Sequence, residues 1–474
     1  MITNLDVIII GAGSAGLAAM RQVSKRTDRF VLINDGPYGT TCARVGCMPS
    51  KALIEAANAF HARRKAEAFG IRGCEYLSIE IPAVMRRVRA LRDRFVDGVL
   101  KMTETLGERS IAGRAHLSGP NEVVVGDQVF RARSIIIATG SSPVMPQPWQ
   151  TLGDRLLTTD TLFDQETLPA RMAVVGLGAI GIELAQALSR LGVDIHAFDS
   201  GNELAGISDP IVAETLRKSL NKEFAIHTGN EVELSGATTA SAGGVRVQAG
   251  AIDIEVDRVL VAIGRKPNLE DLGLESLDVT LDSRGLPPFD RSTMQIAGLP
   301  VFIAGDANAD ARLLHEAADE GYIAGVNAVA DEPTCFQRRT PLAVVFSDPG
   351  VAAIGQRFSS VDTEHCLIGS IDFASQGRAL TAQRNTGVLR VYARPDDARL
   401  LGAEMCAPAA EHMAHLLALA ISRELTVHDL LAMPFYHPVL EEGLRTALRE
   451  IAAKSGQRRS DLTACSNYQA EALD

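Results

Sequence analysis

Near the start of the chain stands the run Val7-Ile-Ile-Ile10, followed by Gly11-Ala-Gly-Ser-Ala-Gly16 and Leu17-Ala-Ala-Met-Arg-Gln-Val23. The apolar run Phe30-Val-Leu-Ile33 comes next. This succession of strand, glycine turn, helix and strand is typical of a βαβ unit. In the G-x-G-x-x-G pattern the first glycine permits the turn, the second lets the backbone approach a pyrophosphate, and the third lets the helix pack closely. The stretch predicts a nucleotide-binding unit.

The same order of elements returns in the middle of the chain. Met172-Ala-Val-Val175 leads into Gly176-Leu-Gly-Ala-Ile-Gly181, a helical run 182–188 follows, and Asp194-Ile-His-Ala-Phe198 closes the unit. One glycine motif is weak evidence, because glycines occur in many tight turns. Two copies, each after a buried strand and before a helix, indicate two dinucleotide-binding domains.

A chain of 474 residues exceeds what one core usually supports and predicts about three domains. A later apolar strand, Val301-Phe-Ile-Ala-Gly-Asp306, is assigned back to the first unit. From about Pro341 the pattern changes, and strands such as Leu389-Arg-Val-Tyr-Ala393 precede two helices. We therefore expect an α/β chain with two Rossmann-like domains and a C-terminal α+β domain. The expected bounds are 1–145 with 270–338 for the first dinucleotide-binding domain, 146–269 for the second, and 339–474 for the C-terminal domain.

Further elements are expected around these units. The pattern predicts helices near 51–69 and 82–106, an apolar strand 134–140, a Pro-rich linker 143–148, and C-terminal helices 412–422 and 441–453. The arginine-rich run 86–94 is typical of a solvated helix face, with a docking surface for an acidic partner as the alternative.

The formal net charge of -11 argues against a nucleic-acid partner, which is held by clustered Lys and Arg. No apolar stretch approaches the roughly 20 residues that cross a bilayer, and the first strand begins almost at once, without a cleavable leader. We expect a cytoplasmic protein without a membrane partner. The seven cysteines are scattered, which does not fit a secreted disulfide framework.

Cys42 and Cys47 are the only closely spaced pair, within Thr41-Cys-Ala-Arg-Val-Gly-Cys-Met-Pro-Ser-Lys51. On a regular helix their separation would be about 7.5 Å of rise, more than a disulfide prefers, so the loop must bend. Pro49 suits the first turn of a helix running through 52–62. Cys47 then lies near a helix N-terminus, where a thiolate is favoured. Two thiols alone cannot complete a tetrahedral metal shell, so we expect a redox pair and no metal site.

His437 stands in Phe435-Tyr-His-Pro-Val-Leu-Glu-Glu442. A lone histidine is more often structural than catalytic, but here a carboxylate at Glu442 can hydrogen-bond one ring nitrogen and raise the basicity of the other. Glu441 is an equal rival on sequence grounds.

An acidic residue at the end of the second strand of such a unit binds ribose hydroxyls and repels a 2′-phosphate. Asp199 occupies that place in the second unit, with no Arg close behind it, which favours NAD over NADP. In the first unit the strand ends in Asn34 and Asp35, and Asp35 is the candidate for the ribose contact.

With these motifs the chain resembles the FAD-dependent pyridine nucleotide-disulfide oxidoreductases over essentially its whole length, and the dihydrolipoamide dehydrogenase type most of all. The resemblance implies that FAD and NAD are the cofactors, with FAD in the domain 1–145 and 270–338, NAD in the domain 146–269, and dimerisation through the domain 339–474. The residues assigned to them are Gly11, Gly13, Ser14, Gly16, Asn34, Asp35, Thr41, Lys51, Ala138, Thr139, Gly140, Gly176, Gly178, Ile180, Gly181, Glu183, Asp199, Gly264, Arg265, Gly305 and Asp306. Asp306 is expected at the ribityl chain and Ile180 beside the nicotinamide.

The resemblance also implies the catalytic roles. Cys42 exchanges with the substrate disulfide, Cys47 contacts the flavin, and Lys51 forms an ion pair with Glu183 near flavin N5. His437 with Glu442 is the acid/base dyad, which reaches the active site of the second subunit of a homodimer with shared active sites. The soluble transhydrogenase, mercuric reductase and glutathione reductase types fit less well, because their cysteine, histidine or NADP features differ from those of this sequence.

Three positions depart from the family pattern: Val439 replaces Thr, Arg44 stands where Asn is usual, and Asn34 replaces Glu. Arg44 adds a charge close to the thiols, which stabilises a thiolate or recognises an acidic substrate group. The expected substrate is a small dithiol or disulfide or a lipoylated carrier protein. The alternatives are a reductase of another disulfide, a metal ion or a quinone, and a flavin redox sensor or carrier-binding module.

Overall fold

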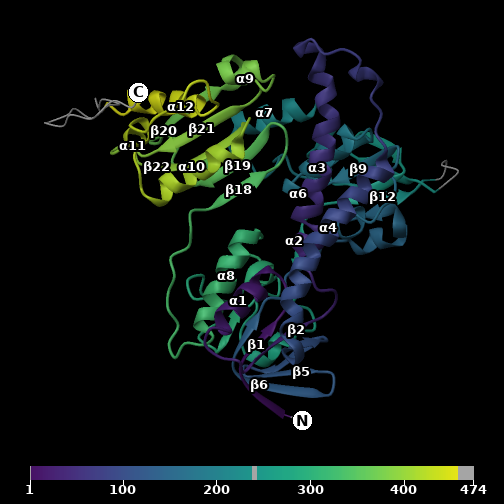
Figure 1. The fold of residues 1–474 in the computed structure, drawn as a ribbon, viewed down its shortest axis with the longest axis vertical. Helices are drawn as coiled ribbons and strands as arrows, with labels where there is room; N and C mark the ends of the chain where they lie inside the picture. The colour runs from purple at the N-terminus through teal and green to yellow at the C-terminus, as the bar shows by residue number, and fades with distance from the viewer. Residues whose placement is uncertain (1, 238–242, 457–474) are drawn as a thin grey trace.

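The computed structural model of the chain describes residues 2–237 and 243–456. A mixed sheet with a parallel core forms its N-terminal unit, a parallel sheet forms its middle unit, and an antiparallel sheet with helices forms its C-terminal unit (Figure 1). The mixed α/β fold class expected from the sequence is confirmed.

The first sheet has the order β3-β2-β1-β6-β5-β4, with β17 paired in parallel to β6. Its strands are β1 (Ile2–Ile10), β2 (Phe30–Asn34), β3 (Ser110–Ala112), β4 (Ala115–Gly119), β5 (Glu122–Val125), β6 (Gln128–Ile137) and β17 (Val301–Ile303). Val7, Ile8 and Ile9 are fully buried, as expected for a parallel strand covered on both faces. Because β17 joins β6, the segment 301–306 lies where the sequence assigned it.

Helices α1 (Ser14–Val23) and α8 (Leu314–Asn327) pack on each other beside this sheet (Figure 1). A Cβ on Gly321 of α8 would lie 2.1 Å from the carbonyl oxygen of Ala15. The close approach of the two helices therefore requires glycine at this position.

The second sheet is parallel throughout, in the order β11-β10-β9-β15-β8. Its strands are β8 (Leu156–Leu157), β9 (Arg171–Val175), β10 (Asp194–Asp199), β11 (Ala225–Thr228) and β15 (Arg258–Val261). An antiparallel meander of β12 (Glu233–Gly236), β13 (Val245–Ala249) and β14 (Ile252–Val256) flanks it, together with α5 (Thr159–Leu162), α6 (Ala179–Arg190) and α7 (Pro210–Leu220).

The connection between these units is more ordered than a Pro-rich linker. β7 (Ser141–Pro143) and β16 (Arg265–Pro267) pair in an antiparallel ladder, and the start of the expected linker belongs to β7. This ladder joins the two segments in which the chain passes between the first and second units.

The C-terminal sheet is antiparallel, in the order β18-β19-β22-β21-β20. Its strands are β18 (Leu342–Val345), β19 (Gly350–Gly355), β20 (Leu367–Asp372), β21 (Val388–Ala393) and β22 (Leu400–Ala407), with helices α9 (Gly377–Thr381), α10 (Ala410–Ser422), α11 (Val427–Leu431) and α12 (Glu442–Lys454). The domain boundaries drawn from the sequence stay predictions.

Three helices between the units carry the cysteine pair and its support: α2 (Thr41–Val45), α3 (Cys47–His61) and α4 (Ile81–Glu104). α3 packs against both α4 and α6, and one apolar core includes Leu53 of α3, Leu184 of α6 and Val345 of β18. One face of α3 is therefore buried against the second and C-terminal units. Within the described ranges, no helix has the length and apolar character needed to span a bilayer.

Candidate active site

The first glycine turn has the geometry of a dinucleotide cradle. Gly11 has a φ of +109°, and a Cβ there would lie 2.2 Å from the Ala138 carbonyl oxygen. A Cβ on Gly16 would lie 1.9 Å from the Gly11 oxygen. Gly13, by contrast, has open space, with its nearest neighbour at 4.0 Å. The outer glycines are required by the protein's own packing, whereas Gly13 leaves its surface free for a ligand to approach.

The second turn repeats this arrangement. A Cβ on Gly176 would lie 2.4 Å from the Ala262 oxygen, and one on Gly181 would lie 1.8 Å from the Gly176 oxygen, but one on Gly178 would meet nothing within 4 Å. Ser14 begins α1 and Ala179 begins α6, so each turn presents helix N-terminal N–H groups suited to phosphate.

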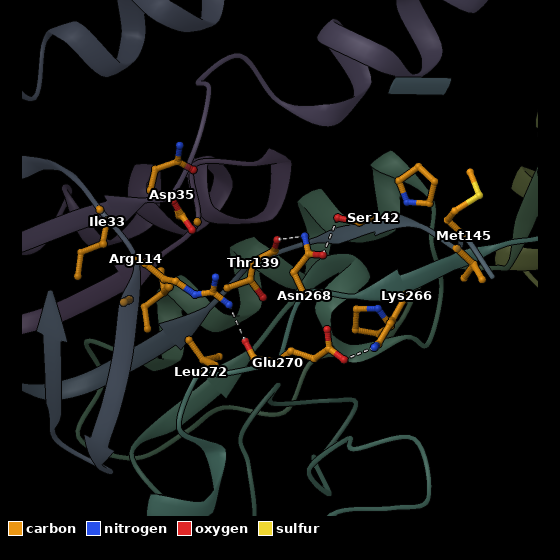
Figure 2. Close-up of a pocket in the computed structure, with 18 of the residues that line it drawn as sticks. Ile33, Asp35, Arg114, Thr139, Ser142, Met145, Lys266, Asn268, Glu270 and Leu272 are labelled. Atoms are coloured by element: carbon orange, nitrogen blue, oxygen red, sulfur yellow. Dashed lines mark hydrogen bonds and ion pairs between the residues drawn. The ribbon is translucent and has the colours of Figure 1, made fainter. Parts of the chain in front are cut away.

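A cavity of about 700 Å³ opens at the first turn (Figure 2). Gly11, Asn34, Asp35 and Thr139 line it. The Thr139 hydroxyl is buried and has no hydrogen-bond partner among the described residues. A buried hydroxyl without a partner is costly, and a bound ligand with polar groups satisfies it. These features fit the adenosine half of a dinucleotide.

Several residues of this cavity were not anticipated. Asn268 donates to the Thr139 carbonyl oxygen and accepts from the Ser142 hydroxyl (Figure 2). The other unanticipated lining residues include Gly113, Arg114, Ala115, Met145, Gln150, Lys266, Glu270 and Leu272. The first three lie where β3 passes into β4, and the others lie in β16 or in the segments that follow β7 and β16. No local motif marks them.

Asp306 is held at the edge of the first sheet. Its carboxylate accepts from the Ser141 hydroxyl at 2.5 Å, and Arg265 donates to the same hydroxyl at 2.8 Å. Burial lowers the pKa of Arg265. The Gly305 N–H donates to Glu320 at 2.7 Å, which fixes the turn that carries Asp306.

In the second unit Asp199 braces its own glycine turn. Its carboxylate accepts from the Leu177 N–H at 2.6 Å and from the Gly201 N–H at 2.8 Å. Ile180, in the first turn of α6, is 38% exposed, and Gly264 has a φ of +117° just after β15. These residues surround the N-terminal end of α6.

The cysteine loop bends as its sequence requires. Gly46 separates α2 from α3, and a Cβ there would lie 3.0 Å from the Thr41 carbonyl oxygen. Cys47 is the first residue of α3, and Cys42 and Cys47 are both free thiols. Cys42 in α2 and Cys47 in α3 therefore lie on either side of the bend at Gly46.

The two thiols are electrostatically unequal. A hydrogen bond from Cys42 and the charge of Lys51 lower the pKa of Cys47 to about 6. The same hydrogen bond, together with burial, raises the pKa of Cys42. At neutral pH Cys47 is therefore the thiolate and Cys42 the protonated partner. The stem of Arg44 lies over Gly39, and the cation that lowers the pKa of Cys47 is Lys51.

Lys51 joins two units. Its ammonium donates to Glu183 of α6 at 2.8 Å, and the Glu183 side chain is only 7% exposed. Lys51 lies one helical turn after Cys47 in α3. The structure therefore contains the expected ion pair between Lys51 and Glu183, one helical turn from Cys47.

His437 forms the expected dyad with Glu442. Its Nδ1 lies 3.0 and 3.1 Å from the two carboxylate oxygens, and this contact lowers the pKa of Glu442. Glu442 also accepts from the Val439 N–H, so the structure selects it over Glu441. The His437 side chain is 81% exposed, and its hydrogen bonds within the described residues go to Glu442 and not to the cysteine loop.

Comparison with known families accounts for most of the chain. Residues 5–321 match the pyridine nucleotide-disulphide oxidoreductase family, and residues 342–448 match the dimerisation domain of that family. The chain belongs to this family. Its members are oxidoreductase flavoenzymes, and membership confirms FAD and NAD(H) as the cofactors and supports a homodimer.

Individual relatives of the family agree with this assignment. The chain is 31% identical to the dihydrolipoyl dehydrogenase of Thermus scotoductus over 93% of its own length and 96% of that protein. It is 29% identical to the human mitochondrial dihydrolipoyl dehydrogenase, covering 96% and 91% of the two chains.

Solved structures give the same result for the fold. LpdA from Mycobacterium tuberculosis superposes with a TM-score of 0.81 at 25% identity, over 94% of this chain and 100% of that one. The copper(II) complex of the HOCl-induced flavoprotein disulfide reductase RclA from Escherichia coli gives a TM-score of 0.81 at 20% identity, over 94% and 99%. The likeness to RclA shows the fold alone.

Proposed function

We propose that this family member oxidises a dihydrolipoyl dithiol to its disulfide, with NAD⁺ as the final acceptor. The observation that carries the proposal is the unequal cysteine pair at the start of α3, in which Cys47 is stabilised as a thiolate beside Lys51. Curated relatives named dihydrolipoyl dehydrogenase match nearly the whole chain, which supports the choice of substrate.

The chemistry of the chain's own residues follows from this arrangement. His437 takes a proton from the substrate dithiol, and the resulting thiolate attacks Cys42 Sγ of the oxidised pair. The Cys42–Cys47 bond breaks and Cys47 leaves as the thiolate. The second substrate thiol then attacks the substrate sulfur of the mixed disulfide. The bond to Cys42 breaks, the substrate disulfide forms, and the proton of the second thiol passes to Cys42, which leaves as a thiol. FAD, when bound, carries the two electrons onward to NAD⁺.

We further propose that His437 acts on the cysteines of a second copy of the chain in a homodimer. The support is its exposure and the lack, within the described residues of one chain, of a hydrogen bond to the cysteine loop. A cytoplasmic location belongs to the same proposal and is supported by the scattered positions of the seven cysteines, which do not fit a secreted disulfide framework.

A second candidate is the reduction of a different disulfide, one that carries acidic groups. Arg44 favours it, because the Arg44 guanidinium has no acceptor among the described residues and its stem lies over Gly39 next to the cysteine loop. A carboxylate on the substrate is a suitable partner for this cation.

A turnover screen tests both candidates. Purified holoprotein is offered dihydrolipoamide, a lipoylated carrier protein and glutathione, each with NAD⁺, and the corresponding disulfides with NADH. Preference for the lipoyl substrates supports the first proposal, and preference for glutathione disulfide supports the second. Slow turnover of every substrate would contradict both.

The redox pair has its own spectroscopic test. Anaerobic addition of two electrons to the holoprotein should produce a long-wavelength thiolate-to-flavin band. Cys47→Ser should abolish the band, because it removes the thiolate next to the flavin. Cys42→Ser should retain a thiolate at Cys47 and show the band without reduction. A band that survives in Cys47→Ser contradicts the assigned roles.

A further inference from the structure

The Lys51–Glu183 ion pair is completed by a residue from the C-terminal unit. Glu183 Oε2 accepts from Lys51, while Oε1 accepts from the backbone N–H of Phe346 at 2.9 Å. The Lys51 ammonium also lies 4.5 Å from the centroid of the Phe346 ring. α3, α6 and the segment after β18 therefore meet at one carboxylate and one ammonium.

The backbone of this segment is fixed independently of the Phe346 side chain. The Asp348 N–H donates to Gln186 at 2.8 Å, and Gln186 donates back to the Asp348 carbonyl oxygen at 2.9 Å. Arg190, one turn further along α6, pairs with the Asp348 carboxylate at 3.1 Å. A substitution at Phe346 thus changes the ring while α6 keeps the backbone in place.

The ring is well placed to restrain the cation. Phe346 is 39% exposed, and the Lys51 side chain is 31% exposed, so water competes for the ammonium. The face of an aromatic ring attracts a nearby cation. Without the ring, Lys51 has more freedom to turn toward solvent.

We propose that Phe346 is a positioning residue, whose ring and backbone N–H together hold Lys51 and Glu183 in the place from which Lys51 acts on Cys47. Phe346 belongs to the unit that matches the dimerisation domain, so that unit contributes directly to the electrostatics of the thiol pair. The inference rests on the proposed role of Cys47 as the reactive thiolate.

The charged and titratable groups that act on Cys47 define the expected effect. Cys42 and Lys51 lower its pKa, and Glu183 raises it. Weaker restraint of Lys51 reduces its stabilisation of the Cys47 thiolate, so Phe346→Leu should raise the pKa of Cys47 by about half a unit. Phe346→Tyr keeps the ring and should restore the original value.

The experiment measures the alkylation rate of Cys47 against pH by site-resolved mass spectrometry, in reduced holoprotein with FAD content and melting temperature recorded. The matched control is Phe358→Leu, because the Phe358 ring lies 5.9 Å from Arg390 in the same unit and away from Lys51. A raised pKa in Phe346→Leu alone supports the proposal. An unchanged pKa in Phe346→Leu, or an equal rise in Phe346→Tyr, overturns it.

Lys51→Met separates this inference from the proposed function. Lys51→Met should itself raise the pKa of Cys47, and adding Phe346→Leu should then change nothing further, since the two act through one interaction. If Lys51→Met leaves the pKa unchanged, the proposed role of Lys51 fails. If Lys51→Met raises the pKa and Phe346→Leu does not, the inference about Phe346 alone fails.

Discussion

Asn34 and Asp199 occupy equivalent places in the two nucleotide-binding units and share a structural task. The Ala12 N–H donates to Asn34 at 3.0 Å, and the Leu177 N–H donates to Asp199 at 2.6 Å. Each side chain thus ties the end of the second strand to the middle of the glycine turn. An amide performs this task as well as a carboxylate, so the replacement of an acid by Asn34 keeps the brace and removes only the charge. Asp35, exposed beside it, is free to meet a ribose.

Asp199→Asn tests whether the negative charge of Asp199, at the second glycine turn, selects the nucleotide. The amide oxygen keeps an acceptor for the Leu177 N–H and loses the one for the Gly201 N–H, and the repulsion of a 2′-phosphate is lost. We expect the ratio of kcat/KM for NADH over NADPH to fall by about tenfold to a hundredfold, which corresponds to about 1.4–2.8 kcal/mol. Steady-state kinetics with both nucleotides measures it. An unchanged ratio would show that Asp199 does not face the ribose.

The acidity of Cys47 depends on the donor at residue 42. Cys42→Ala removes the hydrogen bond that lowers the pKa of Cys47, so the pKa should rise from about 6 toward the ordinary thiol value of about 8.5. Cys42→Ser keeps a hydroxyl donor and should keep the pKa low. Alkylation by iodoacetamide against pH gives both values, because only the thiolate reacts. Equal curves for the two variants contradict the assigned hydrogen bond.

At this scale the sequence predicts residues that act within a local motif. The bend at Gly46 and the position of Cys47 at a helix start follow from chain geometry, and both are observed. The choice between Glu441 and Glu442 was open, because it depends on how the backbone enters α12. Phe346 was missed entirely, since its contact with Lys51 joins residues far apart in the chain and carries no local pattern.

Element α8 supports the FAD side of the molecule through one buried carboxylate. Glu320 is fully buried and accepts from the Gly305 N–H, Asn308 and Arg338. Burial raises its pKa, because the ionised form is poorly solvated there. The helix therefore fixes the turn that presents Asp306.

Glu320→Gln tests this support. An amide oxygen cannot satisfy all three donors, so the free energy of unfolding should fall by about 1–3 kcal/mol and FAD should be lost more readily on dilution. Glu316→Gln is the matched control, because Glu316 also pairs with Arg338, whereas the Gly305 N–H donates to Glu320. Chemical unfolding and bound-FAD absorbance measure the two effects. Equal FAD retention in both variants contradicts the link through Gly305.

Element ends and exposed faces were the least accurate predictions. The helix expected near 51–69 begins at Cys47 and is α-helical only to His61, after which a 3₁₀ helix continues to Phe69. The arginine-rich run in α4 is not simply solvated: Arg89 donates to the Gln165 carbonyl oxygen, and Arg92 pairs with Asp164. Charge patterning along one helix does not reveal acceptors that another unit brings near it.

At the scale of the whole molecule, the repeated glycine motif predicted the parallel sheets because it encodes a complete βαβ unit. The sequence could not predict how the units pack, since one apolar core continues from α3 through α6 to β18. A polar seam accompanies it, where Arg190 of α6 pairs with Glu223 and Asp348 and donates to Asn58 of α3. These contacts depend on the assembled structure and not on any single motif.

The assembly of two chains decides where His437 acts. If each subunit of a two-fold dimer gives His437 to the other, a mixture of Cys47→Ser and His437→Ala subunits behaves differently from either parent. Each mixed dimer then holds one site with both lesions and one intact site, so dithiol oxidation should reappear after subunit exchange. His437→Ala alone should slow oxidation by about 10²–10⁴-fold and retain FAD. Activity assays before and after exchange, with dimer content checked by size-exclusion chromatography, measure the recovery. A mixture that exchanges subunits but stays as inactive as its parents shows that His437 acts within its own chain, because each site of the mixed dimer then keeps one lesion.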